Sequence, residues 1–278
     1  MDNIKSGKEL LDEALSASVG HGGVCFWWLG QLGYLVRAGG VTILIDAYLS
    51  RGHSRLHEPL FEPEELHGID YIFGSHDHLD HIDSVAWKVM AQKMPDAKFI
   101  LPSALAQAVS ERLQIPRSRF YGVNDGTLSY SDDNIKVTAI ASAHESLDRD
   151  DVSGEYLYTG FVIECGGVRL YHSGDNVVYE GLITKLLALM PIDIMFFPIN
   201  GRDARRYRMG LIGNMTYQEA VDMVLAVKPA LAVPGHYDMF ASNSADPADF
   251  TDYMSAKAPR QAVWVGSRGE KVEYSNAK

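Results

Sequence analysis

One six-residue run constrains what this chain can fold into more than any other feature: His76-Asp77-His78-Leu79-Asp80-His81. Three imidazoles and a carboxylate this close together can serve two adjacent divalent ions, because alternate residues of a tight turn face different sides. We therefore expect His76 and His78 to hold one ion, and Asp80 and His81 to face the other. Each ion needs three or four ligands, so the run requires partners from distant parts of the chain.

Candidate partners stand where apolar, strand-like segments end. They are His144 in SAHES, Asp175 in HSGD and His236 in PGHYD. Asp46 closes a further segment of this kind, TILIDAY. Rigid strands support loops that converge on a site, so we expect these side chains to gather there. The alternative is a solvated, histidine-rich turn, but that interpretation leaves the matching positions downstream unexplained.

The order of strand-like and helical segments predicts the architecture. Early β-branched and aromatic segments separated by glycines indicate an antiparallel meander, and strands later alternate with helices. The expected strands are residues 24–29, 34–37, 41–46, 69–74, 98–101, 157–165, 168–172, 192–198, 231–234, 262–265 and 270–274. The expected helices are residues 84–92, 104–113, 181–189, 217–227 and one that begins at Asp246-Pro247. We predict an α/β (α+β) protein in which two sheets pack face to face beneath outer helices, with residues 1–278 in a single domain.

Composition and charge exclude several classes of function. Lysines and arginines number 25 against 36 acidic residues, and a net charge of −11 argues against binding to nucleic acid or to an anionic membrane. The most apolar stretch, residues 186–199, is interrupted by prolines and Asp193, so we expect no membrane span. With two distant cysteines and no signal-peptide pattern, a cytoplasmic location is expected. The amphipathic segment 4–15 could serve contacts in a homo-oligomer.

The sequence resembles the metallo-β-lactamase superfamily, whose five successive motifs occur here in order: Asp46, the six-residue run, His144, Asp175 and His236. The resemblance implies a four-layer αβ/βα sandwich with a cleft for two divalent metal ions at one edge of the sheets.

The same resemblance implies a role for each motif residue. The first metal is then held by His76, His78 and His144. The second is held by Asp80, His81 and His236, and Asp175 bridges the two. Asp46 orients a ligand histidine from behind. His172, in the strand before Asp175, is expected to be a buried, hydrogen-bonded neighbour of the ligands.

The donor types favour hydrolysis. A nitrogen-rich ligand set with a bridging carboxylate suits Zn²⁺ or Mn²⁺ acting as a Lewis acid. Flavodiiron relatives place a carboxylate where this chain has His78, so a hydrolase is favoured over an oxygen reductase. Two such ions would share a hydroxide, lowering the pKa of water toward about 7. We expect Asp80 and Asp175 to be catalytic, with Asp80 or a metal-bound water supplying a proton.

A narrower resemblance begins near residue 200. The segments INGRDARR, GNMTYQEAVDM and PGHYDMFASNSADP are similar to the L-ascorbate-6-phosphate lactonase branch. That branch acts on a small molecule, a phosphorylated sugar-acid lactone such as L-ascorbate 6-phosphate. In an acidic chain, Arg202, Arg205, Arg206 and Arg208 form a cationic group suited to phosphate, and Arg202, nearest the preceding strand, is expected to reach the cleft; the alternative is a solvated face or a subunit contact. Asn176 and Tyr237 follow ligand motifs, and we expect them to contact the substrate.

Two other functions stay open. The same two-metal centre could serve a phosphodiesterase or nuclease, although the acidic balance and the lack of a basic RNA-binding extension count against it. A non-catalytic metal-binding protein would require a relict site, yet every expected ligand is present.

Overall fold

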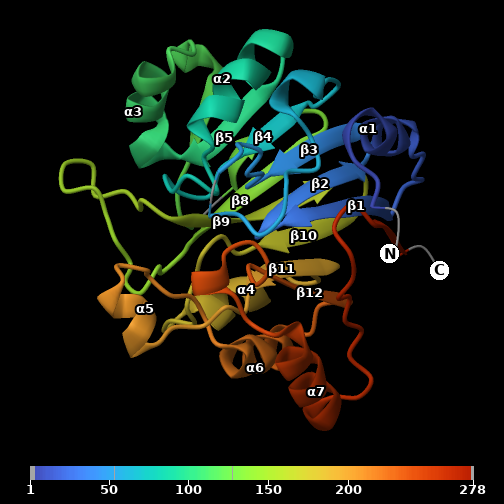
Figure 1. Cartoon of the computed structure of the whole chain (residues 1–278), viewed down its shortest axis with the longest axis vertical. Coiled ribbons are helices and arrows are strands. Elements are labelled where there is room, and N and C mark those ends of the chain that lie inside the picture. Colours follow the sequence, from blue (N-terminus) through green and yellow to red (C-terminus); the bar gives the residue numbers. More distant parts are fainter. Residues whose placement is uncertain (1–3, 53, 127, 277–278) are drawn as a thin grey trace.

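Two β-sheets pack face to face in the computed structural model, which describes residues 4–52, 54–126 and 128–276, and helices cover the outer face of each sheet (Figure 1). The predicted order of layers, helices then sheet then sheet then helices, is confirmed. None of the helices in the described residues has the length and apolar composition that crossing a bilayer requires.

The first sheet has the strand order β13-β1-β2-β3-β4-β5-β6. Its strands are β1 (Gly23–Gly30), β2 (Gly33–Ala38), β3 (Val41–Ile45), β4 (Tyr71–Phe73), β5 (Lys98–Pro102), β6 (Phe120–Val123) and β13 (Lys271–Ser275). The first three form the predicted antiparallel meander, whereas β3 to β6 run parallel. Parallel neighbours need crossovers, which α2 (Ser84–Lys93) and α3 (Ser103–Leu113) supply. These helices and α1 (Gly7–Ser16) pack on the outer face.

The second sheet has the order β12-β11-β10-β9-β8-β7. Its strands are β7 (Leu128–Ser131), β8 (Ile135–Ala141), β9 (Thr159–Cys165), β10 (Val168–His172), β11 (Ile194–Pro198) and β12 (Leu231–Gly235). Strands β7 to β10 are antiparallel, and β10 to β12 are parallel. The helices in this half of the chain are α4 (Leu182–Ala188), α5 (Ala204–Arg208), α6 (Tyr217–Val227) and α7 (Pro247–Lys257). Short 3-10 turns lie at Pro63–Glu65, Arg117–Arg119 and Ala241–Asn243.

Strand β1 shows how the sequence fills both layers of the core. Because successive side chains of a strand point to opposite faces, Val24, Phe26 and Trp28 enter the core between the two sheets. Cys25 and Trp27 face the other way and pack beneath the helices of the first layer. Burial of both faces explains why this strand is an unbroken apolar run in the sequence.

The predicted strand at residues 262–265 is wrong. Val263 forms an isolated bridge to Ala232 of β12, and no ladder follows among the described residues. The ring of Trp264 instead packs 5.5 Å from that of Phe26, between centroids. The segment is therefore held both by this packing and by two backbone hydrogen bonds of 3.0 Å, from the Ala232 N–H to the Ala262 carbonyl and from the Trp264 N–H to the Ala232 carbonyl. Strands β6, β7 and β8 were not predicted, since β6 and β7 are short and β8 mixes polar with apolar residues.

Candidate metal centre

The predicted site residues follow strands that end at one edge of the sandwich. Asp46 follows β3 and His76 follows β4, and these two strands are parallel. In the other sheet, Asp175 follows β10 and His236 follows β12, which run the same way on either side of β11. His144 follows β8, which shares that direction because β8 and β10 are both antiparallel to β9. Parallel strands thus deliver their loops to a common place.

The structure brings the predicted ligands together in two sets of donor atoms. Within each set these atoms all lie within 4.8 Å of one another. The sets are His76, His78 and His144, and Asp80, His81 and His236; a third group that meets the same distance, His76, His81 and Asp175, links them. In the first set, His76 Nε2 and His78 Nδ1 are 2.9 Å apart, close enough for both nitrogens to bind the same ion.

Asp175 lies between the two sets. Its Oδ2 is 3.7 Å from His144 Nε2 of the first set and 3.2 Å from His236 Nε2 of the second. Its Oδ1 is 3.4 Å from His81 Nε2. One carboxylate thus faces histidines of both sets, which is the position that a bridging ligand requires.

Unpartnered polar atoms test whether these residues fit divalent ions. His81 Nε2 and Asp175 Oδ1 are buried without a hydrogen-bond partner among the described residues. Buried polar atoms are normally satisfied, and each orphan costs free energy. His81 Nδ1 is only 2.6 Å from Asp46 Oδ2, and a carboxylate accepts, so Nδ1 keeps its proton and Nε2 is the nitrogen that binds a metal ion once the proton on it is displaced. Donor type, burial and tautomer therefore fit a metal ligand.

Asp46 fixes the run from behind. Its carboxylate accepts hydrogen bonds from the backbone N–H of Ser75 at 2.8 Å and from the Ser75 hydroxyl at 2.5 Å, in addition to the His81 ring. It is fully buried and adopts a left-handed φ of 43°, which aspartate tolerates better than most residues. The end of β3 thereby orients the first and last histidines of the run, since Ser75 Oγ is also 3.0 Å from His76 Nδ1.

His172 lies behind the site and not in either donor set. Its Nε2 is 2.8 Å from the carbonyl oxygen of Leu32, and its Nδ1 accepts from the Gly174 N–H at 3.2 Å. Nε2 therefore joins β10 to the β1–β2 turn, and Nδ1 bonds to the loop that carries Asp175.

Charge and burial shift the pKa values of the histidines in opposite directions. Burial lowers the pKa of His144 to about 4 and holds that of His76 well below its ordinary value. Burial also acts on His81, but the carboxylates of Asp175, Asp80 and Asp46 outweigh it and raise its pKa well above the ordinary value. The first set is thus neutral and ready to bind, whereas a cation at the second set displaces a proton.

Two of the predicted phosphate-binding arginines are committed elsewhere. Arg202 forms a two-pronged contact with Glu219 of α6, at 2.7 Å for each nitrogen. Arg206 donates to the carbonyl oxygens of Asn200 and Ser244 and so ties α5 to neighbouring loops. Arg205 and Arg208 are exposed, and within the described residues their guanidinium groups form no hydrogen bond or ion pair, although Arg205 interacts electrostatically with Asp203.

The structure does not bring Asn176 or Tyr237 into the pocket at the metal sets. Asn176 is fully buried, and its Oδ1 accepts from the Ala143 N–H at 2.7 Å, so it fixes the loop that carries His144. The ring of Tyr237 packs 5.0 Å from that of Trp28, between centroids, and is 7% exposed. Both side chains support ligand loops from the core side.

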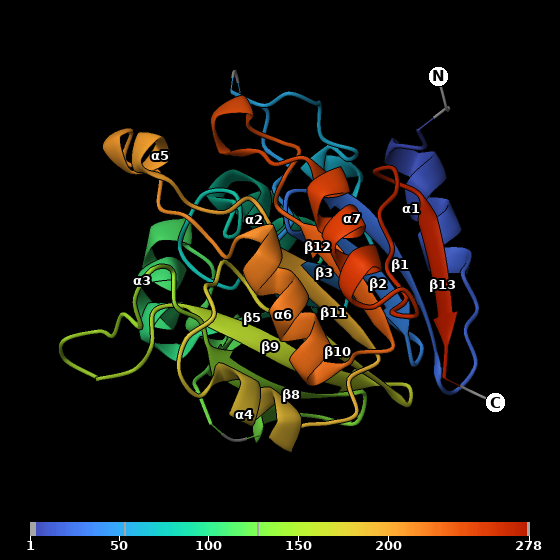
Figure 2. The ribbon, with the colours of Figure 1, turned by 90° about the horizontal axis from the view of Figure 1, so that it is seen from below.

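A pocket of about 370 Å³ opens over the two sets. Besides ligands from both sets, apolar and hydroxyl or amide side chains line it. These are Ser54, Leu211, Ile212, Phe240, Ser242 and Asn243, with Gly210. Residues 210–212 follow α5, which stands out from the body of the molecule (Figure 2). Sequence analysis missed this lining because nothing in the local pattern marks a loop that packs over a distant site.

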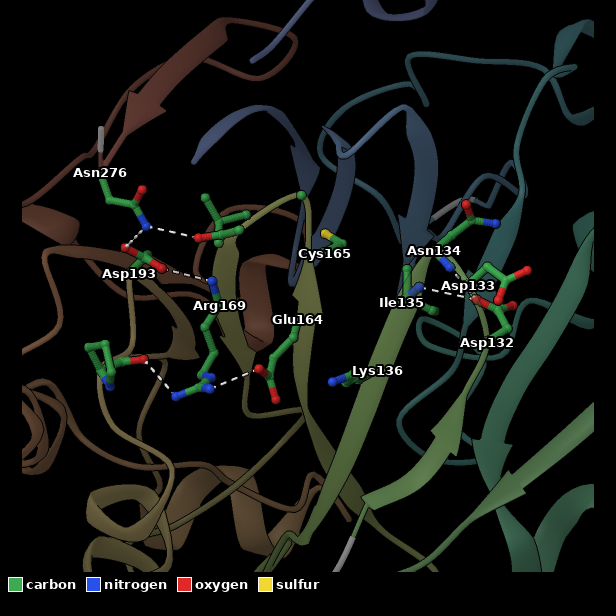
Figure 3. Close-up of a pocket in the computed structure, with 14 residues that line it drawn as sticks. Asp132, Asp133, Asn134, Ile135, Lys136, Glu164, Cys165, Arg169, Asp193 and Asn276 are labelled. Carbon is green, nitrogen blue, oxygen red and sulfur yellow. Dashed lines mark hydrogen bonds and ion pairs between the residues drawn. The ribbon is translucent and has the colours of Figure 1, made fainter. Parts of the chain in front are cut away.

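A second pocket, of about 330 Å³, lies around the β9–β10 turn, at the end of β10 opposite His172 (Figure 3). Three of its charged residues, Glu164, Arg169 and Asp193, are held by contacts within the pocket. Arg169 donates to Glu164 at 2.8 Å, and Asp193 accepts from the backbone of Arg169 at 2.7 Å and from Asn276 at 3.0 Å. No histidine lies among the described residues that line it, so we place the candidate site at the histidine pocket.

Comparison with known proteins gives one family. The beta-lactamase superfamily domain matches residues 41–237. A UPF0173 metal-dependent hydrolase of Archaeoglobus fulgidus is 32% identical over 253 residues, covering 89% of this chain and 98% of the relative. A UPF0173 metal-dependent hydrolase of Pyrococcus abyssi is 27% identical over 249 residues, covering 88% and 97%.

Solved structures share the fold. The metallo hydrolase Igni18 of Ignicoccus hospitalis superposes with a TM-score of 0.71 at 23% identity, covering 92% of this chain and all of its own. An isothiocyanate hydrolase from Delia radicum gut bacteria gives a TM-score of 0.70 at 15% identity, covering 90% and 99%.

Proposed function

This chain belongs to the metallo-β-lactamase superfamily and is one of its metal-dependent hydrolases, and we propose that it opens the ring of a phosphorylated sugar-acid lactone. The observation that carries the proposal is the pair of buried donor sets that share Asp175 beneath a pocket. The narrower substrate is supported by the resemblance of the segments near residue 200 to lactonases of L-ascorbate 6-phosphate.

We assign His76, His78 and His144 to one divalent ion, Asp80, His81 and His236 to another, and Asp175 to both. When bound, Mn²⁺ or Zn²⁺ ions supply Lewis acidity toward the lactone carbonyl and a water of lowered pKa. The chain's own contribution is to hold the donors rigidly: Asp46 keeps His81 in the tautomer that presents Nε2.

Asp80 is the carboxylate that we assign to proton transfer. Its side chain is 19% exposed and lines the pocket, whereas that of Asp175 is 5% exposed. Burial raises its pKa, but the His81 and His236 charges outweigh burial and leave that pKa below the ordinary value, so it is ionised and can accept a proton. It can then pass the proton to the ring oxygen that leaves as the lactone opens.

Substrate anchoring falls to α5 and the pocket wall. The hydroxyl and amide groups of Ser54, Ser242 and Asn243 suit the hydroxyls of a sugar acid. Since Arg202 and Arg206 are engaged within the protein, we assign the phosphate to Arg205. Arg205→Ala should lower kcat/KM for a phosphorylated lactone about tenfold, the worth of one charge-assisted hydrogen bond, and leave the unphosphorylated lactone unaffected. Arg202→Ala, which breaks the contact with Glu219, should affect both substrates equally.

A panel of substrates tests the reaction class. Protein freed of metal and reloaded with Mn²⁺ or Zn²⁺ is given L-ascorbate 6-phosphate, the unphosphorylated lactone and a generic phosphodiester. We expect metal-dependent opening of the phosphorylated lactone and little phosphodiester cleavage. Cleavage of the phosphodiester alone would transfer the function to a phosphodiesterase or nuclease. Tight metal binding with no turnover of any substrate would indicate a non-catalytic metal-binding protein.

A further inference from the structure

Gln31, in the turn between β1 and β2, is fixed at the site by its backbone. Its N–H donates to Asp238 Oδ1 at 2.9 Å, and its carbonyl accepts from the His236 N–H at 2.7 Å and from the Trp28 indole at 3.0 Å. Its φ of 53° is left-handed, a conformation that glutamine seldom adopts without such support. The residue is fully buried. The turn is therefore built to hold one side chain in one place.

The side chain of Gln31 touches two members of the second donor set. Its Nε2 donates to Asp80 Oδ2 at 2.8 Å and lies 3.2 Å from His236 Nε2. Its amide oxygen, Oε1, is buried without a hydrogen-bond partner in the described residues. The NH₂ group of the amide therefore donates to a ligand carboxylate, while the oxygen of the same amide is left free to bind a metal ion.

We propose that Gln31 is a further ligand of the second donor set, supplying its amide oxygen to the ion that Asp80, His81 and His236 hold. An amide presents its N–H to a carboxylate and its oxygen to a cation, and half a turn about its last bond exchanges the two with little change of shape. Without an ion, Nε2 faces the Asp80 carboxylate. With a cation at the second donor set, rotation of the amide would turn Oε1 toward it. This inference rests on the metal roles proposed above and not on the lactone reaction.

The donor types then differ between the two positions. The first set has three imidazoles, whereas the second would have two oxygens, from Asp80 and Gln31, beside two imidazoles. Replacing a nitrogen donor by an oxygen donor favours Mn²⁺ over Zn²⁺. Loss of the Gln31 oxygen should therefore weaken Mn²⁺ binding at the second position more than Zn²⁺ binding.

Metal titration of the full chain tests the proposal without any substrate. Metal-free wild type, Gln31→Met and Gln31→Glu are titrated with Mn²⁺ and with Zn²⁺ against a chelator, and the stoichiometry and two dissociation constants are fitted. Methionine keeps the length but removes the oxygen, and glutamate keeps an oxygen. We expect Gln31→Met to bind the second Mn²⁺ at least about tenfold more weakly with the first unaffected, and Gln31→Glu to stay within about threefold of wild type or to bind more tightly.

Controls separate this role from packing. Gln114, at the end of α3, is a glutamine with a similar left-handed φ of 56° that belongs to neither donor set, so Gln114→Met is the matched control and should leave both metal affinities unchanged. Should Gln31→Met fail to fold, as judged by unfolding of the metal-free protein, Gln31→Asn draws the amide back by one carbon and should show the same selective loss.

The proposal would be overturned if Gln31→Met bound both ions as tightly as wild type. It would also be overturned if Gln31→Glu lost as much affinity as Gln31→Met, because that result would show that the N–H contact to Asp80 is what matters. A wild type that binds a single ion would refute the two-set assignment first, and the role of Gln31 with it. Neither result bears on whether a lactone is the substrate.

Discussion

At the scale of single residues, Asp46 is the side chain on which the orientation of the donors depends most. It is fully buried and holds Ser75 and the His81 ring at once. Asp46→Asn should weaken metal binding about 10- to 100-fold, because asparagine has one accepting oxygen where aspartate has two, and His81 loses the partner that fixes its tautomer. Chelator competition measures the loss. Asp70→Asn is the matched control: Asp70 accepts from the Thr42 N–H at 2.7 Å but contacts no ligand. Equal losses in the two variants would contradict the assignment.

Also at this scale, His144 gives the metal-free protein a pH dependence of known sign. Burial lowers its pKa to about 4, against 6.5 ordinarily. Between these values the unfolded chain binds a proton that the folded chain does not, so His144 costs stability as the pH falls from about 6.5 to about 4. In His144→Gln, the free energy of unfolding should therefore depend less on pH across this window, by up to about 1.4 kcal/mol per pH unit. Urea unfolding at several pH values, with chelator present, measures it; parallel curves would refute the assignment.

The run of histidines could be predicted from the sequence because its members are neighbours in the chain, and their partners could be predicted because each closes an apolar strand. Gln31 could not be predicted, since its contact with Asp80 joins residues 49 positions apart. The contact of Arg202 with Glu219 of α6 could not be predicted either, since these residues are 17 positions apart. An arginine-rich segment looks alike in sequence whether its charges are free or paired.

At the scale of elements, a half-buried carboxylate joins the two sheets. Asp132, after β7, accepts from Lys98 of β5 at 2.6 Å, from Tyr71 of β4 at 2.7 Å and from Tyr130 at 2.7 Å. Asp132→Asn should lower the free energy of unfolding by about 1–3 kcal/mol, since buried partners lose their acceptor and Lys98 its counter-charge. The neighbouring Asp133→Asn, on an exposed side chain, should change it by less than about 0.5 kcal/mol. Urea denaturation compares them, and similar values would show that the contact does not hold the sheets together.

Elements with strong local signals could be predicted. The helix predicted at residues 217–227 is confirmed as α6, and a capping box of Thr216 and Glu219 begins it, with the Thr216 N–H donating to Glu219 Oε2 at 2.8 Å. The segment 262–265 has β-branched and aromatic residues but pairs with β12 only around Ala232, and the ring of Trp264 packs edge-on against Phe26 and Trp28 of the core. Tertiary packing decides such short segments, and no local pattern reports it.

At the scale of the whole molecule, the sandwich is held by a core that both sheets share. Phe26 of the first sheet packs 5.3 Å from Phe196 of the second, and Phe73 packs 5.1 Å from Phe161, between ring centroids. We propose that the chain is a single domain, and we expect one cooperative unfolding transition. Tryptophan fluorescence reports both layers, since Trp28 lies between the sheets and Trp87 beneath the outer helices. It should coincide with far-UV circular dichroism; two separated transitions would indicate independent units.

The proposed reaction requires two ions, one in each donor set, that act together on a lactone. To test this, metal-free protein is titrated with Mn²⁺ while the opening of L-ascorbate 6-phosphate is followed. We expect activity to rise until two equivalents are bound per chain and then to level off. Full activity at one equivalent, or none after two are bound, would contradict it.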